Sequence, residues 1–268
     1  MPETPSAPEV DHEIEEEEFD AVVEEGAERL HRSWRAVLVT GFAGGLEIGI
    51  GVAAYLAVLD ETGSHLLAGF AFSVGLIALL FAHSELFTEN LFLPIAALVA
   101  REGTLRQLGR LWVGTLVANL AGATVITLLL LAAFPDLHDV LVESARHYLD
   151  LGFGWEGVAL ALLAGMVLTL ATRMQQGTES DTAKVVIAVV DGFLLAGLQL
   201  MHSVLDSLFV IGAIALGEAG VLEGVLWFLP TLGLNMIGGL VLVTLLRLLR
   251  TKELLEERRG SGPRIRRS

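Results

Sequence analysis

The sequence predicts an all-α polytopic membrane protein in which six spans form two related halves. Three observations lead to this fold class. Hydrophobic residues make up 53% of the chain, and several apolar stretches approach or exceed the length that a membrane span requires. Two of these stretches are too long for one straight span and are interrupted by polar residues. The basic residues are also distributed among the loops as an even number of spans requires.

The first overlong stretch covers residues 66–100 and contains no Lys or Arg. As one straight helix it would reach about 52 Å, whereas the hydrocarbon core is roughly 30 Å thick. Polar residues, among them His83, Glu85 and Glu89, interrupt it between positions 82 and 90. Because lipid cannot solvate carboxylates or satisfy an opened backbone, we expect a break here that faces protein or a watery cavity.

The second overlong stretch covers residues 183–216 and is interrupted at residues 200–209. Each interruption contains a His-Ser pair and is followed by an Asn: His83-Ser84 with Asn119, and His202-Ser203 with Asn235. The two Asn residues follow the two His residues by 36 and 33 positions. Interrupted helices in corresponding places of two halves indicate a binding or permeation site near the membrane midplane.

The remaining spans are expected at residues 36–59, 105–134, 155–171 and 221–249. With the N-terminus in the cytoplasm, 16 of the 17 basic residues fall on the cytoplasmic side, and only Arg146 falls outside. By the positive-inside rule, we expect a multi-pass protein of the cell (inner) membrane with both termini cytoplasmic. We expect no cleavable signal peptide, because the first thirty residues are acidic and lack an apolar core.

Outside the transmembrane channel domain of residues 36–250, residues 1–35 are expected to form an acidic cytoplasmic segment and residues 251–268 a basic cytoplasmic tail. The acidic segment has acids early and Arg29 and Arg32 late, the order that a helix dipole favours. It is either a solvated helix without a partner or a regulatory plug or partner-binding segment. The net charge of -15 lies mainly in the tails and outer loops, so we expect no nucleic-acid partner. Without cysteine, the chain has no disulfide or thiolate metal site.

His202 is the first candidate for function, because it opens the second break at bilayer depth and titrates in a range suited to proton exchange with a solute. The alternative is a histidine that only packs within the helix bundle. Thr88 is expected to offer its hydroxyl to His202 across the two breaks. Alternatively, Thr88 or Glu85 caps amides freed at the first break.

Asn119 and Asn235 lie inside apolar helices beside glycines, so we expect them to brace the opened backbone rather than to contact the solute. Glu85 and Asn90 are assigned structural roles at the first break. Lys184 begins the second broken segment. It is either a topology anchor or a source of positive potential for anions.

The order of several motifs resembles the formate/nitrite transporter family. These motifs are residues 69–76 (GFAFSVGL), residues 85–88 (ELFT) with Asn90, Lys184 eighteen positions before His202-Ser203, and Pro230 with Asn235 and Gly238-Gly239. The resemblance covers residues 36–250. It implies an aquaporin-like six-helix protomer with two inverted three-helix repeats and two broken helices, assembled as a homopentamer with one pore per protomer.

The resemblance also implies a pore for small monovalent anions in which Thr88 holds a central histidine, His202, and Lys184 attracts the anion. Residues along the pathway would include Phe72, Leu86, Phe87 and Leu200. Several residues depart from the family pattern. Leu200 replaces an aromatic constriction residue, Asp191 replaces a Pro, and polar groups are added at Glu47, His83, Glu89 and Asp206. If ionised and facing the pore, such carboxylates would repel anions by about 4 kcal/mol for a pair 4 Å apart.

The sequence therefore predicts a channel or proton-linked transporter for small monovalent weak-acid anions, with lipid, a small solute and further copies of the chain as partners. One alternative is a pore for cations, protons or neutral solutes that is selected by Glu47, His83, Glu85, Glu89 and Asp206. Another is a non-conducting scaffold that binds metal through these groups. We expect no enzyme and no cofactor, because no nucleophile and base pair, phosphate loop or cofactor fingerprint occurs.

Overall fold

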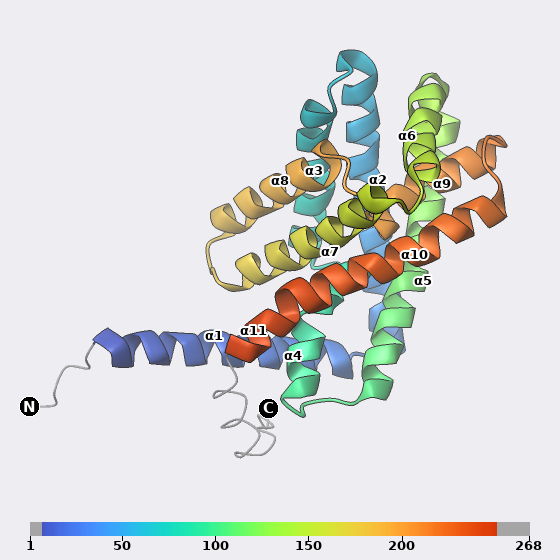
Figure 1. Cartoon of the computed structure of the whole chain (residues 1–268). Helices are drawn as coiled ribbons and strands as arrows, with labels where there is room; N and C mark the ends of the chain where they lie inside the picture. Colours follow the sequence, from blue (N-terminus) through green and yellow to red (C-terminus); the bar gives the residue numbers. More distant parts are fainter. Residues whose placement is uncertain (1–6, 251–268) are drawn as a thin grey trace, which may run out of the picture.

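The protein was analysed as a computed structural model, which describes the backbone of residues 7–250 and the side chains of residues 19–249. The described residues form helices and no strands (Figure 1). Five helices are long and apolar enough to cross a membrane, and two shorter apolar helices accompany them. This arrangement confirms the predicted all-α membrane fold. The expected basic tail lies outside the described residues.

The first half of the membrane part contains the first three crossings. Its elements are α2 (Trp34–Thr62), α3 (His65–Ala82), the 3-10 helix η1 (Phe87–Leu91), α4 (Leu93–Val99) and α5 (Leu105–Ala133). Helix α1 (Ala7–His31) precedes them, and the 3-10 turn η2 (Pro135–Leu137) and α6 (His138–Leu151) follow. Helix α6 occupies a stretch that the sequence analysis treated only as an acidic outer loop.

The second half contains the last three crossings. Its elements are α7 (Trp155–Gln176), α8 (Asp181–Gly197), α9 (Ser203–Leu216), α10 (Val221–Gly239), the π-helical turn η3 (Leu240–Leu245) and α11 (Leu246–Arg250). The last crossing is therefore one helical path with a wider turn in its middle. Pro230 lies inside α10.

Both predicted breaks are present. Helix α3 ends at Ala82 and is followed by an open segment before η1, while α8 ends at Gly197 and α9 begins at Ser203. In each break one residue takes the left-handed conformation, His83 with φ 53° and Gln199 with φ 51°. This conformation turns the chain out of the first half-helix and costs about 1–2 kcal/mol in a residue other than glycine.

The structure corrects the pairing of the two halves. Asn119 accepts a hydrogen bond from the amide of Phe87, and Asn235 accepts one from the amide of Ser203, with distances of 2.8 Å in both cases. Each partner in the second half follows its equivalent by 116 positions. By the same interval His83 corresponds to Gln199, and Leu86 corresponds to His202. The repeated His-Ser pair is therefore a coincidence of sequence, which is why the two spacings to Asn differed by three.

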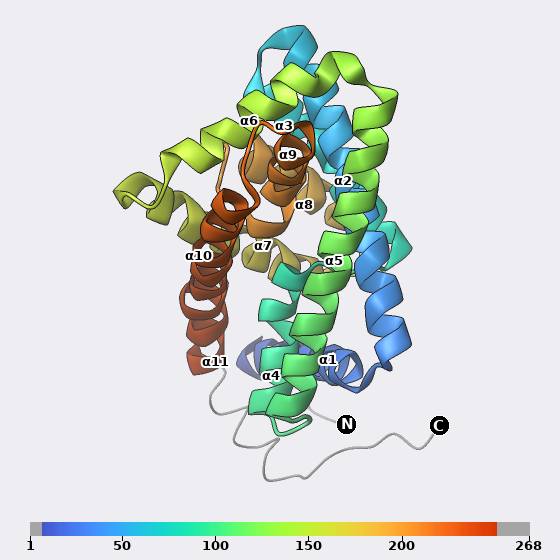
Figure 2. The ribbon, with the colours of Figure 1, turned by 90° about the vertical axis from the view of Figure 1, so that its right-hand side faces the viewer.

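The two halves run in opposite directions. Helix α2 begins beside α1 at one end of the molecule, whereas α7 begins beside α6 at the other end (Figure 2), and α3 packs along α8 between the halves. Gly45 of α2 and Gly165 of α7 allow the close helix approach in each half. A Cβ at either position would collide with the carbonyl oxygen of Asn119 or Asn235, respectively. The predicted inverted repeats are therefore visible in the packing.

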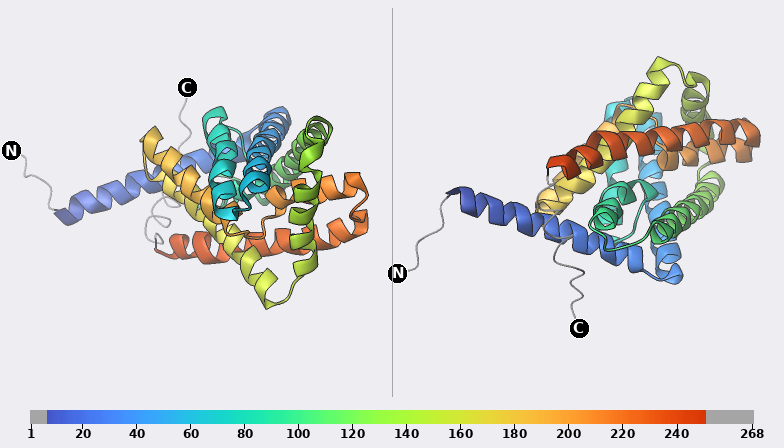
Figure 3. Two further views of the ribbon diagram at one scale, coloured as in Figure 1. Left: turned by 90° about the horizontal axis from the view of Figure 1, so that it is seen from above. Right: turned by 60° about the horizontal axis from the view of Figure 1, so that its bottom comes forward.

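Helix α1 is docked onto the membrane part, which contradicts the interpretation of a solvated helix without a partner. It crosses one end of the bundle beside α4, and its first turns project sideways beyond the other helices (Figure 3). Its side chains Phe19, Val23 and Leu30 are buried in a cluster that also contains Ala96 and Leu111. The acidic sequence of the helix concealed this apolar face.

Candidate functional site

The two breaks meet at His202 and Thr88, which lie on opposite halves of the chain. The Nε2 atom of His202 is 3.2 Å from the Thr88 hydroxyl oxygen, and both side chains have no solvent exposure. Thr88 is carried by η1, and His202 is the residue immediately before α9. The contact expected from the sequence is therefore present, because each break directs one polar side chain toward the other.

The hydrogen bonds of His202 determine which ring nitrogen carries a proton. The amide of Leu205 donates to Nδ1 at 3.1 Å, so Nδ1 is an acceptor and carries no hydrogen. The neutral ring then has its hydrogen on Nε2 and donates it to the Thr88 hydroxyl. A doubly protonated ring would lose the bond from Leu205, so the start of α9 favours the neutral imidazole.

A carboxylate caps the second half-helix at each break. Glu89 Oε2 accepts a hydrogen bond from the amide of Leu86 at 3.1 Å, and Asp206 Oδ2 accepts one from the amide of His202 at 2.7 Å. Such amides carry the positive ends of helix dipoles and attract anions. In this chain, acidic side chains of the protein itself occupy both positions. From the sequence, Thr88 or Glu85 was the alternative considered for such a cap, and Glu89 was expected along the pathway.

Asn119 and Asn235 brace the two breaks with matching bonds. The Asn119 amide group donates to the carbonyl oxygens of Gly41 and Glu85 at 2.7 and 2.8 Å. The Asn235 amide group donates to those of Ala161 and Met201 at 2.8 and 3.0 Å. Each Asn thus satisfies carbonyl and amide groups that a broken helix leaves open.

A vestibule of about 550 Å³ opens beside the first break. It is bounded by α1, the end of α3, the first break, the end of α7 and the beginning of α8. His83 and Glu89 line it, and Lys184 lies at its wall. Its lining contains six carboxylate side chains, Glu24, Glu25, Glu28, Glu85, Glu89 and Asp181, but only three basic ones, Arg29, Arg32 and Lys184.

Two arginines hold the first break in place, Arg29 near the end of α1 and Arg32 just after it. Arg29 Nε lies 3.4 Å from Glu85 Oε1, and Arg32 forms an ion pair with the same oxygen. The carboxylate of Glu85 is 2% exposed, so it depends on these arginines for compensation. Arg29 also donates to Asn90 Oδ1 at 3.2 Å. Burial by itself lowers the pKa of Arg29, but the nearby Glu85, Glu25 and Glu89 outweigh it and raise the pKa above its usual value.

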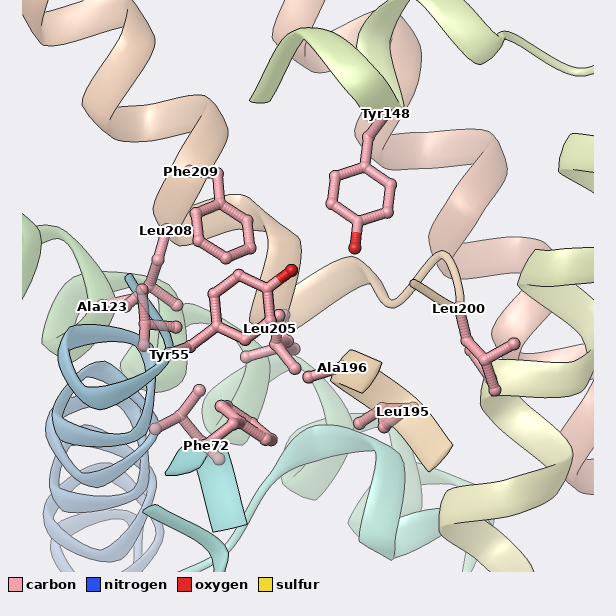
Figure 4. Close-up of a cluster of buried hydrophobic side chains, with 14 of the residues drawn as sticks. Tyr55, Phe72, Ala123, Tyr148, Leu195, Ala196, Leu200, Leu205, Leu208 and Phe209 are labelled. Carbon is pink, nitrogen blue, oxygen red and sulfur yellow. The ribbon is translucent and has the colours of Figure 1, made fainter. Parts of the chain in front are cut away.

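Apolar side chains fill the region between the breaks and α6. Figure 4 shows Tyr55, Phe72, Leu195, Leu205, Phe209 and Tyr148 converging from five helices, with Leu200 from the second break beside them. Phe72, Leu86, Phe87 and Leu200 are all buried. Phe87 packs edge-on against Trp112, with ring centroids 6.0 Å apart. A solute that passes this region meets few polar groups.

One predicted pathway residue, Glu47, is bonded to the first break. Glu47 accepts a hydrogen bond from the Ser84 hydroxyl at 3.0 Å, so it is tied to the beginning of the first break. Sequence reasoning missed the roles of Arg29 and Arg32, because basic residues before a first span are read as topology signals. It counted Asp191 among the acidic departures near the pore but not among the site residues; the structure places it as a buried acid in the apolar α8. An ionisable residue inside an apolar half-helix was the available signal.

Two inverted halves whose broken helices meet at a buried histidine beside a vestibule define a helical membrane channel or transporter. The chain belongs to the formate/nitrite transporter family, whose model matches residues 16–249. It is 28% identical to the formate channel BtFdhC of Bacillus thuringiensis over 234 residues, which cover 82% of this chain and 88% of that protein. It is 27% identical to the formate channel FocA of Escherichia coli strain K12 over 180 residues, 62% of each chain.

Solved structures agree with the fold. A pentameric formate channel with formate bound matches with a TM-score of 0.67 at 21% identity, covering 82% of this chain and 98% of that chain. An ion channel of the same family matches with a TM-score of 0.74 at 18% identity, covering 88% of this chain and 99% of that one. The family and the fold that the motifs indicated are thereby confirmed.

Proposed function

We propose that this protein is a homopentameric membrane channel or proton-linked transporter for small monovalent weak-acid anions of the formate type. Each protomer has its own route, which passes the vestibule and His202. Both termini are cytoplasmic, so that the vestibule opens to the cytoplasm. The observation that carries this proposal is the buried pair of His202 and Thr88 at the meeting point of the two breaks.

The apolar region beyond His202 favours a solute that crosses in neutral form. Moving an unpaired carboxylate through such a region is far more costly than moving a neutral acid. A weak acid can take a proton on one side and release it on the other. A permanent anion of similar size cannot, so the apolar cluster selects for weak acids.

Relatives and the outer surface support the oligomer and the substrate class. The relatives named above include channels described as formate channels, and one matching structure is described as pentameric. Large apolar side chains such as Val113, Val117, Leu226 and Leu229 are exposed along α5 and α10. Such faces are covered by lipid or by neighbouring protomers. Native mass spectrometry in mild detergent should give the mass of five protomers, and a stable monomer or tetramer would contradict the assembly.

The function is tested by uptake of labelled formate into liposomes that contain the purified protein. Wild-type protein should take up formate together with protons, whereas His202→Asn should lose the proton coupling or change its pH dependence and retain the same oligomer. A His202→Asn variant that transports with an unchanged pH profile would overturn the assigned role of the histidine. Chloride serves as the permanent-anion control and should pass much more slowly.

A pore for cations or protons is the second candidate. The excess of carboxylates over basic groups in the vestibule favours it, because this lining attracts cations and repels anions. A gradient of potassium formate separates the two candidates: a cation pore gives a current whose reversal potential follows the potassium gradient, whereas proton-linked passage gives formate uptake without net current. No three His, Asp or Glu side chains of the described residues are grouped so that they could hold a metal ion, so no observation favours the metal-binding scaffold.

A further inference from the structure

A second polar site lies between the vestibule and the paired breaks. Asp191 is 5% exposed, and its Oδ1 atom is buried without a hydrogen-bond partner. It lies in the apolar half-helix α8 and lines a small cavity together with Glu89 of η1. An unpartnered carboxylate oxygen at this depth is strongly unfavourable unless it is protonated or finds a partner.

The cavity is a side chamber of the vestibule. Glu89, Leu79, Thr172 and Gln175 are among the residues that line both spaces. Asp191 lines the small cavity but not the vestibule. The cavity volume is about 10 Å³, close to the roughly 10–15 Å³ that a single water molecule needs. Two carboxyl groups and one small polar space are therefore enclosed together on the vestibule side of the site.

The two carboxyl groups lie before the apolar region on the way from the vestibule to His202. Glu89 follows Thr88 directly in the chain, and Thr88 contacts His202. Other walls of the cavity are apolar and include Leu76, Leu168 and Ala188. A solute that leaves the vestibule toward His202 therefore passes Glu89 before it reaches the apolar region.

Charged groups of the vestibule surround Glu89, whereas Asp191 lies outside the vestibule lining. Those near Glu89 or on the shared wall are Arg29 and Glu25 of α1, Glu85 and His83 of the first break, and Asp181 and Lys184 at the start of α8. Arg29 is already engaged by Glu85, Glu25 and Asn90. For Asp191, Glu89 is the charged group that shares its cavity. Two carboxyl groups in one enclosed site are most stable when they hold one proton between them.

We propose that Glu89 and Asp191 form a carboxyl pair that binds one exchangeable proton and donates it to the carboxylate of the passing weak acid. This inference rests on the proposed function. In the step, the O–H bond of the pair breaks while an O–H bond forms on the substrate, which becomes neutral. The pair gains one negative charge, and water of the vestibule supplies the next proton.

The proton site is tested without transport by infrared difference spectra of the purified protein between mildly acidic and mildly alkaline pH. Wild-type protein should show a carbonyl band of a protonated carboxyl group that both Asp191→Asn and Glu89→Gln remove. Asp191→Glu should retain a shifted band. The exposed Asp60, at the opposite end of α2, gives the matched control Asp60→Asn, which should leave the band unchanged. Elution as the wild-type oligomer verifies folding of each variant.

The donor role is tested by formate uptake with a pH indicator inside the liposomes. At mildly alkaline pH, Asp191→Asn should reduce uptake about tenfold or more, since a lost proton donor typically costs about a hundredfold or more. The difference should shrink as the medium is acidified, because formate then arrives already protonated. The double variant should be no slower than the single ones, because the pair acts as a unit.

The two tests separate the proposals. If both variants keep the wild-type spectrum and the wild-type pH profile, the carboxyl pair is wrong while the anion channel stands. If the band is lost in both variants but wild-type protein transports no formate, the proton site stands and the proposed substrate class is wrong. If the band is lost and uptake keeps its pH profile, the pair binds a proton but does not donate it.

Discussion

The imidazole of His202 can exchange a proton at only one of its nitrogens while α9 remains intact. Its Nδ1 accepts the amide of Leu205, so exchange takes place at Nε2, which faces Thr88. The hydroxyl of Thr88 therefore decides where the exchangeable proton points. Thr88 is therefore placed to orient the ring, as the contact expected from the sequence implies.

Replacing Thr88 by Val should slow formate uptake about five- to tenfold, because a neutral hydrogen bond contributes about 1 kcal/mol and each 1.36 kcal/mol corresponds to a factor of ten in rate. Thr88→Ser should retain most of the uptake. Thr124 bonds only to a carbonyl of its own helix, α5, so Thr124→Val is the matched control. Equal rates for Thr88→Val and Thr88→Ser would show that the hydroxyl does not orient the ring.

The sequence predicted the contact between Thr88 and His202 but did not identify Glu89 as the residue that caps the first break. Two interrupted helices must bring their polar residues together, and this constraint was sufficient to predict the contact. By contrast, Glu85 and Glu89 are both four residues or fewer from the opened amides, so the spacing alone cannot tell which one caps η1. The answer depends on Arg29 near the end of α1 and on Arg32 just after it, which neutralise Glu85.

At the scale of the elements, each broken helix is held open by one asparagine from a neighbouring span. Because Asn119 and Asn235 are fully buried and each bonds one amide and two carbonyl groups, the two breaks are rigid parts of the fold. The predicted bracing role agrees with this geometry. The exact register of the repeat was beyond the sequence, because it follows from backbone partners rather than from side-chain identity.

Asn235→Asp keeps the acceptor oxygen for the amide of Ser203 but removes the donors to Ala161 and Met201. It should lower the stability of the oligomer by about 1–3 kcal/mol for each carbonyl left unsatisfied, which is a larger change than in Thr124→Val. The measurement is thermal unfolding of the purified oligomer in one detergent. Asn119→Asp should behave alike, since its bonds match. A melting temperature equal to that of wild type in both variants would contradict the bracing role.

Helix α1 is fixed by an ion pair that the sequence did not indicate. The double variant Arg29→Ala with Arg32→Ala leaves the buried carboxylate of Glu85 without compensation, which is strongly unfavourable. Hydrogen–deuterium exchange of the α1 amides should accelerate at least about tenfold. Adding Glu85→Gln should restore part of the protection, because no charge is then left uncompensated.

The exposed Arg35 provides the control for this experiment, and Arg35→Ala should exchange as wild type does. Unchanged exchange in the double variant would mean that the apolar contacts of Val23 and Leu30 alone hold the helix. The sequence missed this docking because the acidic composition of α1 predicts a solvated surface. Its apolar positions became meaningful only once α4 was placed beside it.

At the scale of the whole molecule, the number of spans followed from the sequence because hydrophobic length and loop charge are both one-dimensional properties. The vestibule did not, since its walls come from α1, α3, α7 and α8, which are far apart along the chain. The acids of α1 were therefore assigned to a tail, whereas Glu24, Glu25 and Glu28 line the entrance to the route. Their field acts on any ion that approaches the site.

Neutralising this field should change ion selectivity. The double variant Glu24→Gln with Glu28→Gln removes two exposed carboxylates from the vestibule but leaves Glu25 with its partner Arg29. At low ionic strength the permeability of formate relative to potassium should rise about two- to threefold, and high salt should abolish the difference, because exposed charges are screened within about 10 Å at 0.1 M salt. The measurement is the initial rate of labelled formate uptake relative to that of a potassium tracer, in liposomes that contain the purified protein. The variant Asp60→Asn with Glu61→Gln removes equal charge at the opposite end of α2 and should not alter entry through the vestibule. If the vestibule variant keeps the wild-type ratio at low salt, the acids of α1 do not select ions, and selectivity rests on the groups at the breaks.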